Sequence, residues 1–381
     1  MGIGPVWQAP PDGRELLQWL RLIRSHNIGP QTFWGLLGKY GSASATLHAL
    51  PEISSRTSQG RSVKLASEAD ATKELDLVQR YGGQIVATGQ AGYPILLAQV
   101  ESPPPLLTVM GDASIAGPRT IGIVGARNAS ASGRKLSELM AHGLGTHGII
   151  IASGLARGVD THAHQASLGT GTVAVTAGGI NRIYPKENKD LYRQITENGA
   201  VVSEMPFNAE PIARHFPRRN RLISGMSAGV VVIEAAARSG SLITARFALE
   251  QGREVFAVPG SPLDQRAQGT NGLLRNGATL VQTPEDVLEG IESQFSAPGD
   301  LEDQVEGRSI GQSRGTAPEA TRKYDDSIND EVLGLLSSTP VHIDELARMC
   351  GAHISIVSTA VLELELGGQA IRHPGGGVSA T

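Results

Sequence analysis

Short apolar runs alternate with amphipathic segments throughout residues 120–292. The runs are rich in Val and Ile, and the segments between most of them are long enough for helices. Strands that are apolar on both sides and are separated by helices are typical of a mostly parallel sheet covered on both faces. The pattern therefore predicts an α/β, Rossmann-like domain. We expect strands at Ile121–Val124, Ile149–Ala152, Val173–Thr176, Val201–Ser203, Val230–Glu234, Val255–Ala257 and Leu280–Val281, and helices at Ser132–Leu144, Gly158–Leu168, Lys189–Asn198, Ser241–Gln251 and Pro284–Ile291.

The N-terminal region has a helical pattern instead. Leucines recur at helical spacing over residues 14–23, and two further helices are expected at Gln31–Tyr40 and Ala43–Leu50. Helices joined by a Gly-containing turn, His26–Pro30, resemble a helix-hairpin-helix or sterile-alpha-motif-like bundle, whose turn amides can bind the DNA backbone. A small helical cap on the main domain is the alternative.

Residues 51–118 lead from this region into the α/β domain. A helix near Val63–Tyr81, a short strand at Gln84–Thr88 and an edge strand at Leu106–Met110 are expected. The chain then divides into an N-terminal helical domain (1–80), a Rossmann-like core (81–292), a flexible linker (293–323) and a small C-terminal domain (324–381). The linker is expected because its residues are polar and rich in Gly and Ser.

The C-terminal domain has the pattern of a winged helix, with three helices and a two-stranded hairpin. A DNA-reading third helix would carry Arg or Lys. Here the third helix carries Glu363 and Glu365 and no basic residue. Protein contact or a structural role is therefore favoured over DNA reading. The helices are expected at Asn329–Leu336, Ile343–Met349 and His353–Leu366, and the strands at Gln369–Arg372 and Gly377–Ser379.

Composition limits the partners and the compartment. The 381 residues carry a net charge of −4, so any contact with nucleic acid must come from a local basic patch. Cys350 is the single cysteine, which excludes an intramolecular disulfide and fits a reducing compartment. The N-terminus lacks the features of a signal peptide, and no apolar stretch is long enough to span a bilayer. We expect a cytoplasmic protein with no membrane partner.

The first candidate chemistry lies in the turns after the strands. Thr120–Arg127 is a strand that ends at a Gly-containing turn, Ser153–Asp160 repeats this arrangement, and Gly178-Gly179 follows the third strand. Because the carboxyl ends of parallel strands share one edge, these turns predict a cradle of N–H donors for phosphate. Any α/β protein also needs glycine in such turns. Asp160 is expected to cap the helix that follows. The candidates for DNA binding are Gly125, Ala126, Arg127, Ser153, Gly154, Arg157 and Gly158.

A second candidate is the basic segment Pro211–Arg221, which carries four arginines, one Phe and one His. Arginine grips phosphate, and an aromatic ring offers a surface on which an unpaired base can stack. The alternative is a solvated basic loop with Phe216 in the core, in which Asn220 and one arginine form internal hydrogen bonds. The candidates are Arg214, Phe216, Arg218, Arg219, Asn220 and Arg221.

A third candidate follows the strand that ends in Glu234. Ser239, Gly240, Ser241 and Thr244 lie where a turn enters the next helix. Their hydroxyls suit either a phosphate or the cap of that helix.

Other chemistries lack their motifs. The chain has no G-x-x-x-x-G-K-[ST] for ATP, and the first turn is not the G-x-G-x-x-G of NAD-binding proteins. His162 and His164 are two apart on an expected helix and face different directions, so they do not predict a shared metal. We therefore expect no cofactor, no metal and no catalytic residue.

Seven ordered motifs of the core resemble the DNA processing protein A family (DprA, also called Smf). The N-terminal helices and the C-terminal domain resemble accessory domains of that family more loosely. The motifs are Ile123–Arg127, Ser153–Asp160, Ile183–Pro185, Ser203-Glu204, Phe216–Gly225, Glu234-Ala235 and Ser239–Ala245.

This resemblance implies a cytosolic bacterial protein that is not an enzyme. It would bind and shield single-stranded DNA during natural transformation, help to load the RecA recombinase, and dimerise through the Rossmann-like domain. Arg127 would grip backbone phosphate, and Phe216 with its neighbouring arginines would line the strand pocket.

An enzymatic alternative is a nucleotide N-glycosidase similar to the cytokinin-activating phosphoribohydrolases, whose folds are akin to this one. Glu234 would then be the catalytic carboxylate. That family has a P-G-G-x-G-T-x-x-E pattern, and the matching region here, Ser239–Thr244, lacks it. The DNA-binding hypothesis is therefore preferred.

Overall fold

The structure is a computed structural model that describes residues 13–56, 64–295, 327–337, 340–373 and 376–381. It divides into two compact units, one within residues 72–302 and the other within 13–71 and 303–381. The linker expected over 293–323 lies outside the described residues, except for its first three positions, which belong to helix α12. Among the helices of the described residues, none combines the length and the apolar character needed to cross a bilayer.

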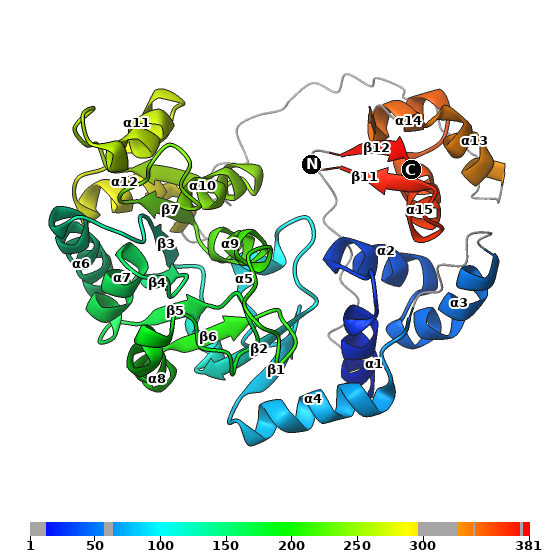
Figure 1. The fold of residues 1–381 in the computed structure, drawn as a ribbon, viewed down its shortest axis with the longest axis horizontal. Helices are drawn as coiled ribbons and strands as arrows, with labels where there is room; N and C mark the ends of the chain where they lie inside the picture. Colours follow the sequence, from blue (N-terminus) through cyan, green and yellow to red (C-terminus); the bar gives the residue numbers. More distant parts are fainter. Residues whose placement is uncertain (1–12, 57–63, 296–326, 338–339, 374–375) are drawn as a thin grey trace, which may run out of the picture. The chain divides into compact units, whose positions relative to one another are not determined.

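The larger unit is built on a nine-stranded sheet with the order β1-β2-β6-β5-β4-β3-β7-β8-β9 (Figure 1). The seven strands expected in the core are present and pair in parallel. The two short strands expected before them add to one edge in antiparallel pairing. The strands are β1 (Gln84–Ala87), β2 (Leu106–Gly111), β3 (Thr120–Val124), β4 (Ile150–Ser153), β5 (Thr172–Val175), β6 (Ala200–Ser203), β7 (Gly229–Val232), β8 (Glu254–Ala257) and β9 (Thr279–Leu280).

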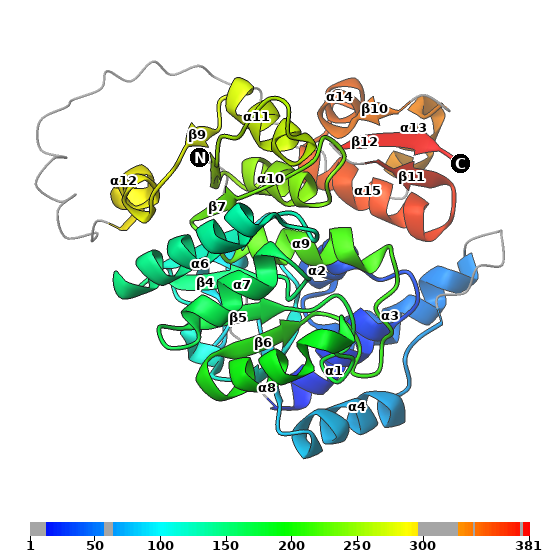
Figure 2. The same cartoon turned by 60° about the vertical axis from the view of Figure 1, so that its left-hand side comes forward.

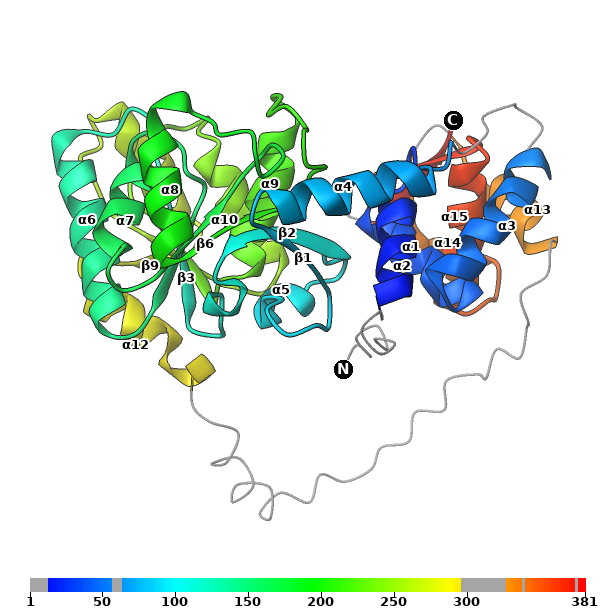
Figure 3. The same ribbon diagram turned by 90° about the horizontal axis from the view of Figure 1, so that it is seen from below.

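Helices cover both faces of this sheet, as the apolar strands require. Val173 and Val175 join the core beneath α5, α9 and α10, whereas Ala174 between them packs toward α8 on the other face, beside α6 and α7 (Figure 3). The helices of this unit are α5 (Ile95–Ala98), α6 (Ala131–Thr146), α7 (Val159–Ser167), α8 (Lys189–Asn198), α9 (His215–Gly225), α10 (Ser241–Glu250), α11 (Gln268–Arg275) and α12 (Pro284–Phe295), with short 3-10 turns η1 (Ala113–Ile115), η2 (Lys186–Asn188) and η3 (Gln265–Ala267). Helix α4 (Glu68–Arg80) begins in the smaller unit and continues into this one.

The direction of the chain across the sheet reverses at β3. From β3 the chain moves outward through β4, β5 and β6, and it then returns to place β7 on the other side of β3. Helix α6 after β3 and helix α10 after β7 pack on opposite faces. Such a reversal opens a crevice at the carboxyl ends of the two strands, which is where open α/β sheets bind ligands.

The smaller unit contains two sets of helices. The first set is α1 (Gly13–Arg24), α2 (Pro30–Tyr40) and α3 (Ala43–Arg56), and Gly41 ends α2 with a φ of +82°. The second set combines three helices with a three-stranded sheet of order β10-β12-β11, which is the expected winged helix plus one additional short strand, β10 (Figure 2). Its elements are α13 (Ser327–Leu335), β10 (Val341–His342), α14 (Ile343–Met349), α15 (Ile354–Leu366), β11 (Ala370–Arg372) and β12 (Gly377–Ala380).

Helices α2 and α15 of the smaller unit touch each other. Leu362 of α15 lies against the backbone at Gly35, where an added Cβ would be 3.0 Å from Leu362 Cδ2. Lys39 of α2 forms an ion pair with Glu363, which also accepts a hydrogen bond from Asn329 Nδ2 at 2.6 Å. The acidic third helix of the winged domain therefore has a basic partner within its own chain.

Candidate nucleic-acid interface

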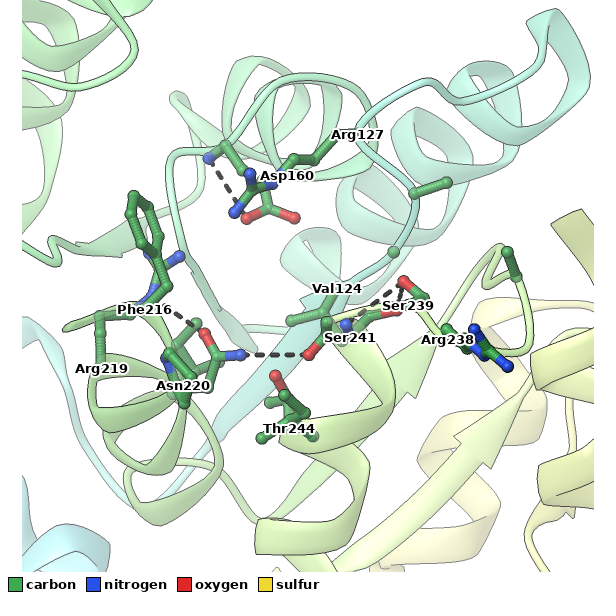
Figure 4. Close-up of a pocket in the computed structure, with 18 of the residues that line it drawn as sticks. Val124, Arg127, Asp160, Phe216, Arg219, Asn220, Arg238, Ser239, Ser241 and Thr244 are labelled. Atoms are coloured by element: carbon green, nitrogen blue, oxygen red, sulfur yellow. Dashed lines mark hydrogen bonds between the residues drawn. The ribbon is translucent and has the colours of Figure 1, made fainter. Parts of the chain in front are cut away.

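An open cavity of about 580 Å³ lies at the carboxyl ends of β3 and β7 (Figure 4). Its walls are the turn after β3, the first residues of α9 and the turn between β7 and α10. This volume is within the range of small-ligand sites. The cavity brings together many of the candidate residues from all three sequence motifs, namely Gly125, Ala126, Arg127, Phe216, Arg219, Asn220, Ser239, Gly240, Ser241 and Thr244.

Two glycines hold the turns of this wall close together. A Cβ at Gly125 would lie 2.6 Å from Val159 Cγ2. Gly158 has a φ of +75°, and a Cβ there would lie 2.3 Å from the carbonyl oxygen of Ala126. Both glycines therefore allow the turn after β3 to pack on the turn after β4.

Glu234 fixes the turn that carries Arg127. The backbone N–H of Ser130 donates to Glu234 Oε2 at 2.9 Å, and the Ser130 hydroxyl donates to Oε1. The same hydroxyl oxygen accepts from Gly133 N at 2.9 Å and so caps α6. Both oxygens of this carboxylate are thus engaged with Ser130, so Glu234 connects β7 to the start of α6.

Arg127 lies over an aromatic ring at the mouth of the cavity. Its guanidinium carbon is 5.1 Å from the centre of the Phe216 ring, a distance at which a cation and a ring attract each other. Within the described part of the chain, no ion pair engages Arg127, and the residue is exposed. An exposed guanidinium and an aromatic ring therefore lie together, one on the turn after β3 and the other at the start of α9.

Arg219 has a different environment, because its side chain is buried. Its Nη1 donates to the carbonyl oxygens of Gly154 and Val175, and its Nε donates to Asn220 Oδ1 at 3.1 Å. Burial lowers the pKa of Arg219 to about 10, while the nearby charge of Asp160 opposes this shift. Arg219 therefore supports the floor of the cavity and contributes positive potential to it.

Asp160 was expected to cap α7, and this expectation is wrong. The cap position is Gly158, and no side chain caps the helix. Asp160 is buried and accepts hydrogen bonds from the backbone N–H groups of Gly154, at 3.1 Å, and Ala156, at 3.3 Å. Burial raises the pKa of this carboxyl, and the charge of Arg219 opposes the shift. Asp160 thus organises the turn before the helix.

The other two arginines of α9 share one buried acid. Arg218 Nε donates to Glu204 Oε1 at 2.9 Å, and Arg221 pairs with the other oxygen. Positions three apart on a helix lie on the same face, which explains the shared partner. The Glu204 side chain is only 4% exposed, whereas Arg218 is 44% exposed. This cluster connects α9 to the residue that follows β6.

The remaining candidates lie outside the cavity lining. Ser153 is buried and donates to the carbonyl oxygen of Ile123 at 2.6 Å, and Arg157 forms an ion pair with Glu187. Arg214 is exposed just before α9. Gly154 and Gly158 hold the turn after β4.

Sequence reasoning missed three polar residues that line the cavity: Asn128, Arg238 and Arg266. Arg238 lies between Glu234 and Ser239, in a turn that was already a candidate, so its position was a usable signal. Arg266 had no comparable signal, because it lies on the η3 turn and pairs with Asp264 at 3.0 Å.

No cluster of His, Cys, Asp and Glu suited to a metal occurs in the ranges that the structure describes. His162 contacts Glu138 at 2.9 Å, whereas His164 is buried and contacts Thr172 at 2.7 Å. The two rings thus have separate environments, as their spacing predicted.

The fold and the cavity define a class: an α/β protein with a Rossmann-like core, an arginine-bearing cavity at the strand reversal, and helical and winged-helix domains. Residues 84–292 match the family described as DNA recombination-mediator protein A. Residues 13–76 match the DprA-like N-terminal HHH domain, and residues 316–376 match the DprA winged helix domain. The chain belongs to the DNA recombination-mediator protein A family.

Known relatives agree with this assignment. The chain is 40% identical over 287 residues to Protein Smf of Escherichia coli K12, covering 74% of each chain. The X-ray structure of DNA processing protein A from Streptococcus pneumoniae is similar over 74% of this chain and 98% of that one, with 31% identity and a TM-score of 0.61. A structure of DNA processing protein A from Helicobacter pylori, described for its single-stranded DNA binding mode, covers 56% of this chain and 97% of that one, with 26% identity and a TM-score of 0.51.

Proposed function

We propose that the protein binds single-stranded DNA at the cavity beside β3 and β7 and acts as a recombination mediator. The observation that carries this proposal is the Arg127 guanidinium over the Phe216 ring at the strand reversal. A cation for phosphate next to a ring for a base is the combination that binding of an unpaired strand requires. The relative from Helicobacter pylori, described as binding single-stranded DNA, supports the proposal.

The cavity residues divide into two groups by their availability. Arg127 and Arg238 are exposed and suit phosphate, while Phe216 suits a base. The hydroxyls of Ser239 and Ser241, which are 2.8 Å apart, offer further hydrogen bonds to the strand. The other candidates support the turns and α9 from within the fold, and the buried guanidinium of Arg219 adds positive potential; they are Gly125, Ala126, Ser153, Gly154, Gly158, Arg219, Asn220, Arg221 and Thr244.

Three more arginines extend the basic character beyond the cavity. Arg157, Arg214 and Arg218 are exposed and are available to neighbouring phosphates of a longer strand. Arg157 and Arg218 already have carboxylate partners, so Arg214 is the strongest of the three candidates.

A preference for single strands follows from the position of Phe216. A base must leave its stack to place its face on this ring, and a base in a duplex loses stacking and pairing when it does so. We therefore expect oligo-dT to bind more tightly than its duplex with oligo-dA.

The more specific roles are those that the family resemblance implies. We propose that the protein shields DNA taken up during natural transformation, assists the loading of RecA, and works as a homodimer formed through the Rossmann-like domain. The single cysteine fits a reducing, cytosolic setting for this work.

The test is a titration of fluorescent oligo-dT and of its duplex at two salt concentrations. The proposal predicts tighter binding of the single strand and a strong loss of affinity at the higher salt. Equal affinity for both forms, or binding that does not respond to salt, would overturn it. A strand-exchange assay with RecA then tests the loading role.

The N-glycosidase alternative is not favoured, because both Glu234 oxygens accept from Ser130 and the related family's motif is absent. Incubation with nucleoside monophosphates should release no free base, and release of base would revive the alternative.

A further inference from the structure

We propose that Tyr184 forms a second base-stacking position, just outside the cavity, for the nucleotide next to the one on Phe216. This inference rests on the proposed binding of single-stranded DNA and extends it to a residue outside the cavity lining. Tyr184 belongs to the loop before η2, and its ring contacts Phe216 edge-on, with centres 5.6 Å apart and planes inclined at 66°.

The three side chains form a continuous row. Arg127 lies 5.1 Å from the centre of the Phe216 ring, and Phe216 in turn contacts Tyr184. The two rings are too close and too steeply inclined to hold one base between them as a parallel sandwich. Each ring therefore offers its face to a different base, and the row suits successive nucleotides of one strand.

The packing of Tyr184 against Phe216 does not by itself explain why Tyr184 is exposed to solvent. Tyr184 is 47% exposed, and among the described residues its hydroxyl has no hydrogen-bond partner. The buried tyrosines Tyr93 and Tyr192 both donate to backbone carbonyl oxygens at 2.7 Å. A large ring held at the surface by its neighbours, with no internal partner for its hydroxyl, is typical of a contact surface.

The charges beside the row suit a polyanion. Lys186, two residues after Tyr184, and Arg214, two residues before Phe216, are exposed and have no carboxylate partner in the described part of the chain. Arg182 and Arg157 are also nearby in sequence, but they pair with Glu210 and Glu187. Each aromatic ring thus has, two residues away along the chain, an exposed cation with no carboxylate partner in the described residues, and cations near stacking rings are what backbone contact with base stacking needs.

The experiment compares Tyr184→Ala and Tyr184→Phe with the wild-type protein. The matched control is Tyr81→Ala, because Tyr81 is 40% exposed and meets Phe207 edge-on at 5.5 Å, outside the cavity lining. The probes are labelled thymidine monophosphate and fluorescent oligo-dT of increasing length, from the dinucleotide upward. Tyr184→Ala should lose roughly fivefold or more in affinity for the oligomers and little for the mononucleotide, which occupies Phe216 alone. Tyr184→Phe and Tyr81→Ala should bind as the wild type does.

Three outcomes separate this inference from the proposed function. If the wild-type protein fails to bind oligo-dT, the proposed function fails. If the wild type binds and Tyr184→Ala matches it at every length, only the second stacking position is wrong. An equal loss at every length would mean that Tyr184 merely positions Phe216, which also overturns the inference. Photocrosslinking of iodouracil-substituted oligo-dT to the wild type should place an adduct on Tyr184, and its absence while Phe216 crosslinks would count against the position.

Discussion

Arg127 and Arg219 line the same cavity, yet the guanidinium of Arg127 is exposed to a ligand whereas that of Arg219 is buried. Arg219 donates to carbonyl oxygens of two strand ends, so moving it toward a ligand would leave buried acceptors unpaired. The Arg127 guanidinium is exposed and lies over the face of Phe216. Both residues are arginines in Gly-rich or basic motifs, and only the fold distinguishes the structural role from the exposed one.

A buried histidine makes the stability of the core depend on pH. His164 Nδ1 is 2.7 Å from Thr172 Oγ1, and its Nε2 has no hydrogen-bond partner among the described residues. Burial lowers the pKa of His164 to about 3. The unfolded chain therefore takes up a proton at higher pH than the folded protein does. The contribution of neutral His164 to the free energy of unfolding is therefore lost as the pH falls below about 6.5, the ordinary pKa of histidine.

We predict that His164→Asn flattens this dependence. From pH 7 to pH 5 the free energy of unfolding of the wild type should fall by about 2 kcal/mol more than that of the variant, because each unit of pKa difference corresponds to about 1.4 kcal/mol. Urea unfolding at the two pH values measures the difference. His147→Asn, at an exposed ring, is the control and should behave as the wild type. Parallel pH dependences in wild type and His164→Asn would contradict the assignment.

At the scale of elements, the periodicity of apolar residues was sufficient to predict the strands of the sheet and most of the helices that cover it. The expected helix Lys189–Asn198 has the bounds of α8, and the expected strands lie within a few residues of the observed ones. The strand order was not predictable, because it depends on contacts between distant residues. The sequence pattern did not predict helix α9. Pro217 is compatible with this helix because it lies in the first turn, where a backbone N–H would have no partner within the helix.

Helix α11 was missed for a related reason. Gly269 and Gly272 lie inside this helix, and glycine disfavours a helix interior, so the sequence pattern predicts no helix here. Gly269 is needed there, because a Cβ would lie 2.7 Å from the carbonyl oxygen of Ala235. The sequence predicts Arg127, Phe216 and Ser241 as candidates in three separate motifs, and the structure brings all three to one cavity. They did not predict that Glu204 pairs with two arginines of α9, since ion-pair partners depend on how the elements pack.

The start of α6 provides a prediction about an element. Ser130 caps this helix and donates hydrogen bonds to both oxygens of Glu234, so it holds the turn that carries Arg127. Ser130→Ala should lower the free energy of unfolding by about 1 kcal/mol. It should also weaken oligo-dT binding, because the turn loses its side-chain anchor. Ser130→Thr keeps the hydroxyl and should retain both properties. A Ser130→Ala protein that is less stable but binds normally would show that binding does not need this anchor.

At the scale of the whole molecule, a net charge of −4 coexists with a local concentration of cations. In the smaller unit, Glu363 of α15 pairs with Lys39 of α2. Both side chains are about one-fifth exposed, and Leu362 fills the neighbouring contact. The acidic character of α15 thus serves a contact within the chain.

Charge reversal tests this contact. Lys39→Glu and Glu363→Lys should each destabilise the smaller unit, and the double variant should recover part of the loss. After discounting for solvent screening, the coupling free energy should be about 0.5–1 kcal/mol. A double-mutant cycle of thermal or urea unfolding measures it. Additive losses with no recovery would mean that the two side chains do not interact in solution.

The most direct measurement of the binding site is the salt dependence of oligo-dT affinity for the wild type and for Arg127→Ala. The matched control is Arg193→Ala, which removes an exposed arginine of α8 that pairs with Glu197 outside the cavity lining. If Arg127 holds one phosphate, its loss should lower affinity about tenfold at low salt and reduce the slope of log K against log salt by about 0.7. Arg193→Ala should leave both nearly unchanged. An Arg127→Ala protein with wild-type affinity and slope would contradict DNA binding at the cavity beside β3 and β7.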